Sequence, residues 1–384
     1  MTTERNIDLG LDQVQTPALI LDESRMVRNI SRLADRISSK GAILRPHLKT
    51  VKSIEVASRL LTDGVGPATV STLAEAEAFA KMGVKDIIYA VGITPQKLDR
   101  VAAVRSGGCD LTVILDSVAQ AQVVAEASLR LGQPIPALIE LDCDGHRSGV
   151  APGDQVLVEI GSILNEGGAL RGVLTHAGES YEVYGKQAHA KFAEQERLAA
   201  VTAAETLRAA GLPCPVVSIG STPTAHAIEN LDGITEVRAG VYAFFDLVQA
   251  GIGVCDVEDI ALSVLTTVIG HQREKGWIIT DAGWMALSQD RGTASQKVDQ
   301  GYGVVCDEAG HVLLDLVVLK ANQEHGIIAR RPGSNAGMPD LPFGARLRIL
   351  PNHACAMAAQ HREYNVIPSE CGGALKTWPR FGGW

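Results

Sequence analysis

Eight short apolar segments alternate with helix-length segments between about residues 41 and 240, and this alternation restricts the chain to few folds. Several of the apolar segments have no polar residue at alternate positions, which is typical of parallel strands covered on both faces. Strands are expected at 42–46, 67–70, 87–91, 111–115, 136–141, 170–175, 215–219 and 235–237. Helices are expected between them, among others at 51–61, 71–82, 117–131 and 186–210.

Eight strands that alternate with helices in this way predict a (β/α)8 barrel within an α/β fold. A doubly wound open sheet is the alternative arrangement. No GxGxxG motif follows the early strands, however, and that motif is typical of the open dinucleotide-binding sheet. We therefore predict a barrel over residues 25–245.

The pattern changes after residue 240. β-Branched segments at 261–271, 277–281, 312–318 and 346–350 are separated by Gly, Asp and Pro turns, which predicts an antiparallel β-domain over 246–384. Residues 1–24 contain one more strand, 18–21, which could join the C-terminal sheet. A helix is expected from 23 to 38, because four apolar residues fall on one of its faces: Met26, Ile30, Leu33 and Ile37.

The composition narrows the classes of function. A chain of 384 residues with 46% hydrophobic and 21% charged residues is typical of a globular protein with more than one domain. A net charge of −9, without any Lys/Arg run, argues against nucleic-acid or membrane partners. The polar segment 1–13 lacks the apolar core of a signal peptide, and the seven scattered cysteines suit reduced thiols. We expect a cytoplasmic protein that binds a small molecule.

Polar residues follow four of the expected barrel strands. Lys49 follows the first strand, the segment 142–149 follows the fifth, and His176 follows the sixth. The seventh strand is followed by the segment 220–222. Catalytic groups of (β/α)8 barrels lie where strands end and loops begin, so these four ends predict one active site.

Two of these strand ends suggest specific chemistry. Gly220, Ser221 and Thr222 are small residues that could expose backbone N–H groups and hydroxyls to a phosphate at the start of a helical turn. An ordinary turn is the alternative. Lys49, if partly desolvated at a strand end, would be a nucleophile toward an aldehyde, whereas a surface lysine is the alternative.

His353 and Cys355 form a second candidate site. In a strand or extended loop, side chains two residues apart point the same way, so both could reach one cation. Two protein ligands would leave positions open for water or substrate, which suits Lewis-acid chemistry. A buried cysteine beside a structural histidine is the alternative.

Several motifs carry a resemblance to a known family. They include RPHLKTVKS (45–53), DGHRSGV (144–150), LTHAGESYE (174–182), PVVSIGSTPTA (215–225), TEVRAGVYAFFDLV (235–248) and RILPNHACA (348–356). With these motifs the chain resembles the fold-type III pyridoxal-phosphate (PLP) enzymes over nearly its whole length. The branch that it resembles contains D-serine dehydratase, D-threonine aldolase and D-threo-3-hydroxyaspartate dehydratase.

The resemblance implies a role for each candidate residue. Lys49 would be the Schiff-base lysine, Arg147 would face the 3′-oxygen of PLP, and His176 would lie beside the pyridine ring. Tyr181 lies in the loop that follows His176. Phosphate would be bound by Gly220, Ser221, Thr222 and Tyr242, and a divalent metal by His353 and Cys355.

The resemblance also implies a reaction. We expect a lyase that removes the hydroxyl group of a β-hydroxy D-amino acid, with 3-hydroxyaspartate giving oxaloacetate and ammonia. Aldolases of the branch tend to pair histidine with aspartate, so Cys355 favours dehydration. The alternatives are retro-aldol cleavage to glycine and an aldehyde, dehydration of D-serine, or a non-catalytic PLP-binding protein. Zinc, manganese, cobalt and magnesium all remain candidate metals, and a homodimer is expected.

Overall fold

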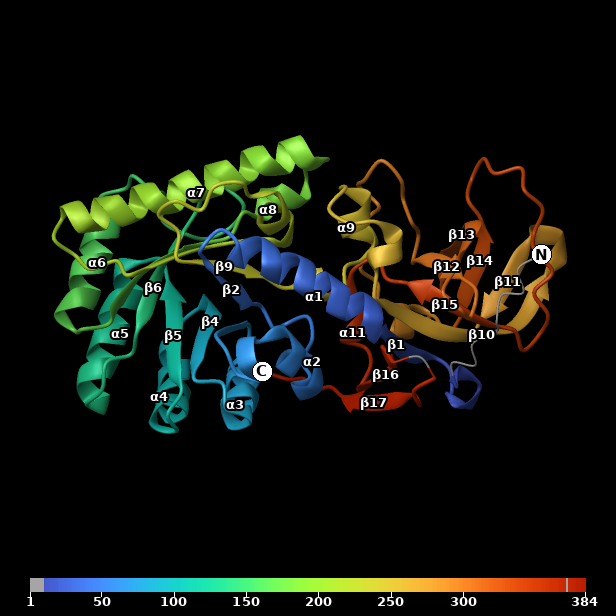
Figure 1. Ribbon diagram of the computed structural model, residues 1–384, viewed down its shortest axis with the longest axis horizontal. Helices are drawn as coiled ribbons and strands as arrows, with labels where there is room; N and C mark the ends of the chain where they lie inside the picture. The colour runs from blue at the N-terminus through green and yellow to red at the C-terminus, as the bar shows by residue number, and fades with distance from the viewer. Residues whose placement is uncertain (1–9, 371) are drawn as a thin grey trace. The chain divides into compact units, whose positions relative to one another are not determined.

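The computed structural model describes residues 10–370 and 372–384, so the N-terminal segment 1–9 and Cys371 lie outside the described residues. The chain divides into two compact units (Figure 1). The barrel unit contains Ile30–Tyr242 and Gly382–Trp384, and the β unit contains Met1–Asn29 and Ala243–Phe381. In the described part of the chain, no helix is both long and apolar enough to cross a membrane.

The barrel unit contains an eight-stranded parallel sheet in the order β2-β9-β8-β7-β6-β5-β4-β3. The Leu48 amide donates to the Thr69 carbonyl at 2.8 Å and a bridge joins His47 to Thr69, so the first and last strands meet and the barrel closes. The predicted barrel is thus confirmed. Its strands are β2 (Ile43–Pro46), β3 (Ala68–Val70), β4 (Asp86–Gly92), β5 (Asp110–Leu115), β6 (Ala137–Leu141), β7 (Leu170–Thr175), β8 (Val216–Ile219) and β9 (Glu236–Ala239).

Helices follow the barrel strands in sequence. Thr72 and Ser117 begin two of them by accepting a hydrogen bond from the backbone N–H three residues later, and Gly83 and Gly132 end the same helices with left-handed backbone. The helices are α2 (Ile54–Leu60), α3 (Leu73–Met82), α4 (Leu98–Ser106), α5 (Val118–Leu131), α6 (Val156–Glu166), α7 (Lys186–Ala209) and α8 (Thr222–Ala227). Before them, α1 (Glu23–Ser38) has the predicted bounds, and its four predicted apolar residues are buried.

The β unit contains a nine-stranded sheet in the order β11-β14-β13-β12-β15-β10-β1-β16-β17. The N-terminal strand β1 (Ala18–Asp22) joins this sheet, as predicted. Among the described residues, only its pairing with β16 is parallel, so the sheet is not purely antiparallel. The other strands are β10 (Leu262–Gln272), β11 (Trp277–Thr280), β12 (Val304–Cys306), β13 (Val312–Ala321), β14 (Gly326–Arg330), β15 (Arg346–Leu350), β16 (Glu363–Ile367) and β17 (Lys376–Pro379).

Short helices connect parts of the β unit. They are α9 (Leu247–Gly251), α10 (Trp284–Leu287) and α11 (Ala354–Ala358). The first begins at Asp246, whose carboxylate accepts a hydrogen bond from the Gln249 amide at 3.0 Å. The last follows β15 and contains one of the two candidate metal ligands, Cys355.

Candidate active site

The predicted cofactor residues lie in loops at one end of the barrel. Lys49 lies in the turn after β2, Arg147 follows β6, and His176 follows β7 directly. Gly220 and Tyr242 follow β8 and β9 in the same way. Because carboxyl ends of parallel barrel strands meet at one face, these five residues surround a common mouth.

His176 is held in one tautomer within this group. Its Nδ1 lies 2.9 Å from the Gly220 carbonyl oxygen, which only accepts hydrogen bonds, so Nδ1 carries the proton. Desolvation, together with the positive charges of Lys49 and Arg147, lowers the pKa of His176 to about 3. The ring is therefore neutral near pH 7, and its Nε2 is free of a proton.

His176 should make the stability of the protein depend on pH. The unfolded chain binds this proton near pH 6.5 and the folded chain only near pH 3, so the free energy of unfolding falls as the pH falls between these values. Replacing His176 with Asn, whose amide can donate to the same carbonyl, should reduce this dependence by roughly 1 kcal/mol per pH unit. Urea unfolding of the cofactor-free proteins at several pH values measures it. The same pH dependence of the free energy of unfolding in wild type and variant would contradict the lowered pKa of His176.

The phosphate cradle differs in one respect from the sequence prediction. The Gly220 amide donates to Glu196 Oε1 at 2.9 Å, and the Ser221 amide donates to Thr224 Oγ1 at 3.1 Å. Both N–H groups are thus already bonded within the protein, and the prediction that they are exposed to a phosphate is wrong. The cause is local, because Ser221 caps α8 in a capping box with Thr224.

Two hydroxyl groups remain for a phosphate. Thr222 Oγ1 and the Tyr242 hydroxyl are both buried, and neither has a hydrogen-bond partner among the described residues. A buried polar group without a partner costs roughly 1–3 kcal/mol, which phosphate oxygens would offset. Burial raises the pKa of Tyr242, so its hydroxyl keeps its proton and can donate to an anion. The cradle therefore fits the phosphate of PLP.

Removing the Tyr242 hydroxyl should weaken cofactor binding. For Tyr242→Phe we expect about a tenfold to hundredfold increase in the Kd for PLP, because a hydrogen bond to a charged group contributes about 1.5–3 kcal/mol. Fluorescence titration of the cofactor-free protein with PLP measures this constant. Tyr364→Phe, which changes a buried tyrosine of the β unit, is the matched control. An unchanged Kd for Tyr242→Phe would refute the phosphate contact.

Gly220 is required for a steric reason. Its φ is +139°, and a Cβ atom at this position would lie 2.0 Å from the Arg238 carbonyl oxygen. Only glycine permits this close approach of the β8 end to β9.

The remaining two predicted cofactor residues lie nearby. The Arg147 side chain is 53% exposed, with Nη2 3.7 Å from Glu140 Oε1. The Tyr181 ring centroid lies 6.3 Å from that of His176.

A network of charged side chains in the barrel strands was not predicted from the sequence. Arg45 of β2 pairs with Glu236 of β9 and Asp86 of β4, each at 2.8 Å. The Arg238 side chain is buried, and its Nε donates to Ser218 Oγ at 2.9 Å. Charged residues inside otherwise apolar strands were the available signal, but their pairing depends on strand register.

The candidate metal pair lies in the β unit, and its local structure corrects the sequence prediction. His353 is the N-cap of α11 and Cys355 lies in the first turn of this helix, so the pair is not part of a strand. The helix begins here because the Ala354 amide donates to Asp246 at 2.9 Å. Burial lowers the pKa of His353, but hydrogen bonds with Asp290 and Cys355 outweigh it and raise the pKa to about 11.

The donor set of this pair fits a divalent cation. The two side chains lie within hydrogen-bonding distance of each other, and imidazole with thiolate is a common ligand combination. Among the described residues, no group of three or more His, Cys, Asp and Glu side chains is placed to hold a metal ion. The protein would thus supply two ligands and leave other positions to water or substrate.

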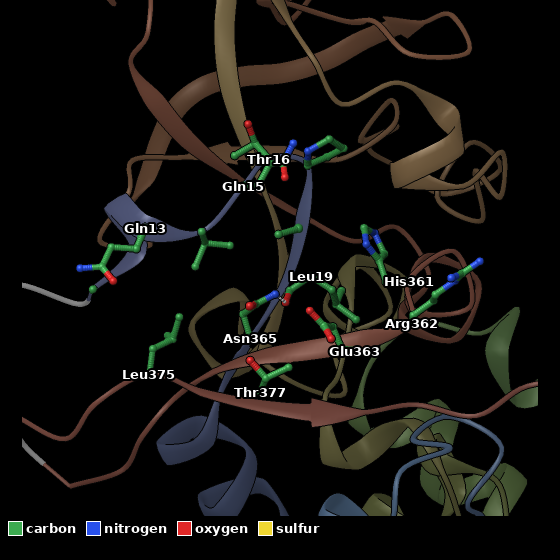
Figure 2. Close-up of a pocket in the computed structure, with 14 residues that line it drawn as sticks. Gln13, Gln15, Thr16, Leu19, His361, Arg362, Glu363, Asn365, Leu375 and Thr377 are labelled. Atoms are coloured by element: carbon green, nitrogen blue, oxygen red, sulfur yellow. Dashed lines mark hydrogen bonds between the residues drawn. The ribbon is translucent and has the colours of Figure 1, made fainter.

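A separate pocket of about 800 Å³ lies in the β unit (Figure 2). Its walls come from the segment that leads into β1 and from β16 and β17, and Glu363 and Asn365 are among its lining residues. None of the candidate site residues lines it.

Two family models match the sequence and identify the family of the chain. Residues 21–248 match the family model described as "Alanine racemase, N-terminal domain", and residues 261–367 match the "Putative serine dehydratase domain". The chain belongs to the fold-type III family of PLP enzymes. The resemblance inferred from the motifs is thereby confirmed.

Relatives within this family are similar over nearly the whole chain. The D-threo-3-hydroxyaspartate dehydratase of Delftia sp. (strain HT23) is 54% identical, over 97% of this chain and 98% of the relative. The D-serine dehydratase of Dictyostelium discoideum is 28% identical, over 96% of each chain. The solved structure of the Delftia enzyme superposes with a TM-score of 0.94 over 97% of this chain and 99% of that one. A cysteine-to-alanine variant of a D-threo-3-hydroxyaspartate dehydratase, solved in a metal-free form, is 54% identical and superposes with a TM-score of 0.94 over 97% of this chain and 99% of that one.

Proposed function

We propose that this family member is a PLP- and metal-dependent lyase that converts D-threo-3-hydroxyaspartate to oxaloacetate and ammonia. One observation carries the proposal: the 54% identity to an enzyme of that activity extends over 97% of the chain. The lysine, the phosphate cradle and the His–Cys pair are all present in this chain.

Each predicted cofactor residue at the barrel mouth has a role in the proposed reaction. When bound, PLP supplies an electron sink that weakens the substrate's Cα–H bond. Lys49 would hold the cofactor through its amine, and its Nζ would be the base that takes the Cα proton of the substrate. Arg147 would bind the 3′-oxygen of PLP, and neutral His176, with Tyr181 in the following loop, would lie beside the pyridine ring. Thr222 and Tyr242 bind the phosphate.

The His–Cys pair has a separate task in the proposal. His353 and Cys355 would hold a divalent cation, which supplies Lewis acidity toward the β-hydroxyl group. Hydroxide is a poor leaving group, so Lewis-acid assistance would lower the barrier to its departure. The ligand types favour zinc, and manganese, cobalt or magnesium are the alternatives.

Initial rates on three substrates test the proposal. We expect D-threo-3-hydroxyaspartate to react with a higher kcat/KM than D-serine or D-threonine. The same PLP chemistry could instead cleave the Cα–Cβ bond, as in the aldolases of the branch. A higher kcat/KM for D-threonine, with glycine as the product, would replace the dehydratase proposal with the aldolase alternative.

The location, oligomeric state and partners of the enzyme are also proposed. We infer a cytoplasmic homodimer that binds a small-molecule substrate and neither nucleic acid nor membrane. The net charge of −9 and the absence of a Lys/Arg run support the last part. Light scattering of the purified holoenzyme measures the mass, and a monomer mass would reject the dimer.

A further inference from the structure

We propose that Asp290 is a positioning residue that orients His353 for metal binding. Its Oδ2 lies 2.6 Å from His353 Nδ1. Nδ1 therefore donates to the carboxylate, and Nε2 is the nitrogen that remains for a cation. The inference rests on the proposed function, because it takes His353 as a metal ligand.

Asp290 is not itself arranged as a third ligand. One of its oxygen atoms accepts a hydrogen bond from His353 Nδ1, and the carboxylate also accepts one from the Gly292 amide. Metal-bound histidines commonly donate their second ring N–H to a carboxylate, which fixes the tautomer and the ring orientation. The contacts of Asp290 match this pattern.

The loop that carries Asp290 is tied to the residue before His353. The Asp290 amide donates to Ser288 Oγ at 3.0 Å. Further along the loop, the amide and hydroxyl groups of Thr293 donate to Asn352 Oδ1 at 3.1 and 2.6 Å. Asn352 is buried, and its Nδ2 donates to the Gly301 carbonyl at 2.6 Å. The carboxylate and the imidazole are therefore held on connected segments.

The residue after His353 is fixed as well. The Ala354 amide donates to Asp246, whose side chain is buried and also accepts from the Gln249 amide at 3.0 Å. With the backbone held on both sides, rotation of the imidazole is the main freedom left to His353. The contact with Asp290 removes that freedom and selects Nε2 for the cation.

Zinc affinity of the PLP-loaded protein tests this inference. Bound metal is first removed from the protein with a chelator. Zn²⁺ is then titrated in competition with a chromogenic zinc indicator. For Asp290→Ala we expect about tenfold to hundredfold weaker zinc binding, with an unchanged PLP content and an unchanged melting temperature of the metal-free protein. Asp290→Glu, which restores a carboxylate, should recover part of the affinity.

A matched control is available in the same unit. Asp307 contacts His311 Nδ1 at 3.1 Å on an exposed surface, so Asp307→Ala should bind zinc like the wild type. Asp290→Asn provides a second variant of similar shape if the alanine variant does not fold. Wild-type affinity in a folded Asp290→Ala protein would overturn the positioning role and leave the proposed function intact. A wild-type protein that binds no divalent metal would overturn both.

Discussion

Replacing Lys49 with alanine is expected to reduce turnover of D-threo-3-hydroxyaspartate by more than about 10³-fold. In the proposed mechanism, the variant lacks both the amine that holds the cofactor and the group that moves the Cα proton. It should also lose covalent attachment of PLP. Borohydride reduction followed by peptide mass spectrometry measures the attachment, and it should label the peptide with Lys49 in the wild type.

Lys85→Ala is the matched control for this experiment. Lys85 is an exposed lysine of the same unit and directly precedes β4, so it lies at the opposite end of the strands from the mouth. Its variant should keep both activity and attachment. Full turnover by Lys49→Ala, or label on another lysine in the wild type, would contradict the assignment of Lys49.

The second large effect concerns the His–Cys pair. Cys355→Ala, or removal of metal by a chelator, is expected to lower kcat by about 10³-fold, because Lewis-acid stabilisation contributes several kcal/mol. PLP should remain attached to Lys49, since the cofactor residues belong to the barrel unit and the pair to the β unit. Steady-state rates and the visible absorption spectrum, measured on the same samples, separate the two effects.

Cys255→Ala provides the control, because Cys255 is another reduced cysteine of the β unit. It should retain wild-type rates before chelation. Adding zinc or manganese back should restore the chelated wild type but not Cys355→Ala. If chelated protein kept its full rate, dehydration would not depend on a metal and the role of the pair would be wrong.

The strands that form the barrel were predictable because each carries its own apolar pattern. The strand ends then identified Lys49, His176 and the 220–222 segment as neighbours, since a parallel barrel places them at one face. Short strands of the β unit were missed. One of them, β12, has only three residues, Val304–Cys306, and its place depends on pairing with β13 and β15.

The details of both sites depend on contacts between residues far apart in sequence. The Gly220 amide donates to Glu196, which lies 24 positions away in the sequence. The residues next to Gly220 therefore do not show that its N–H group already has a hydrogen-bond partner. Asp246 caps the helix of Cys355 from 108 positions away, and the HAC motif by itself is equally compatible with a strand. Asp290 beside His353 was missed for the same reason.

Product analysis with D-threo-3-hydroxyaspartate tests the proposed reaction most directly. The purified holoenzyme is incubated with this substrate, and ammonia, oxaloacetate, glycine and glyoxylate are quantified at full conversion. Dehydration predicts one ammonia and one oxaloacetate for each substrate consumed, without glycine. One glycine and one glyoxylate for each substrate would contradict it and show that the enzyme breaks the Cα–Cβ bond instead.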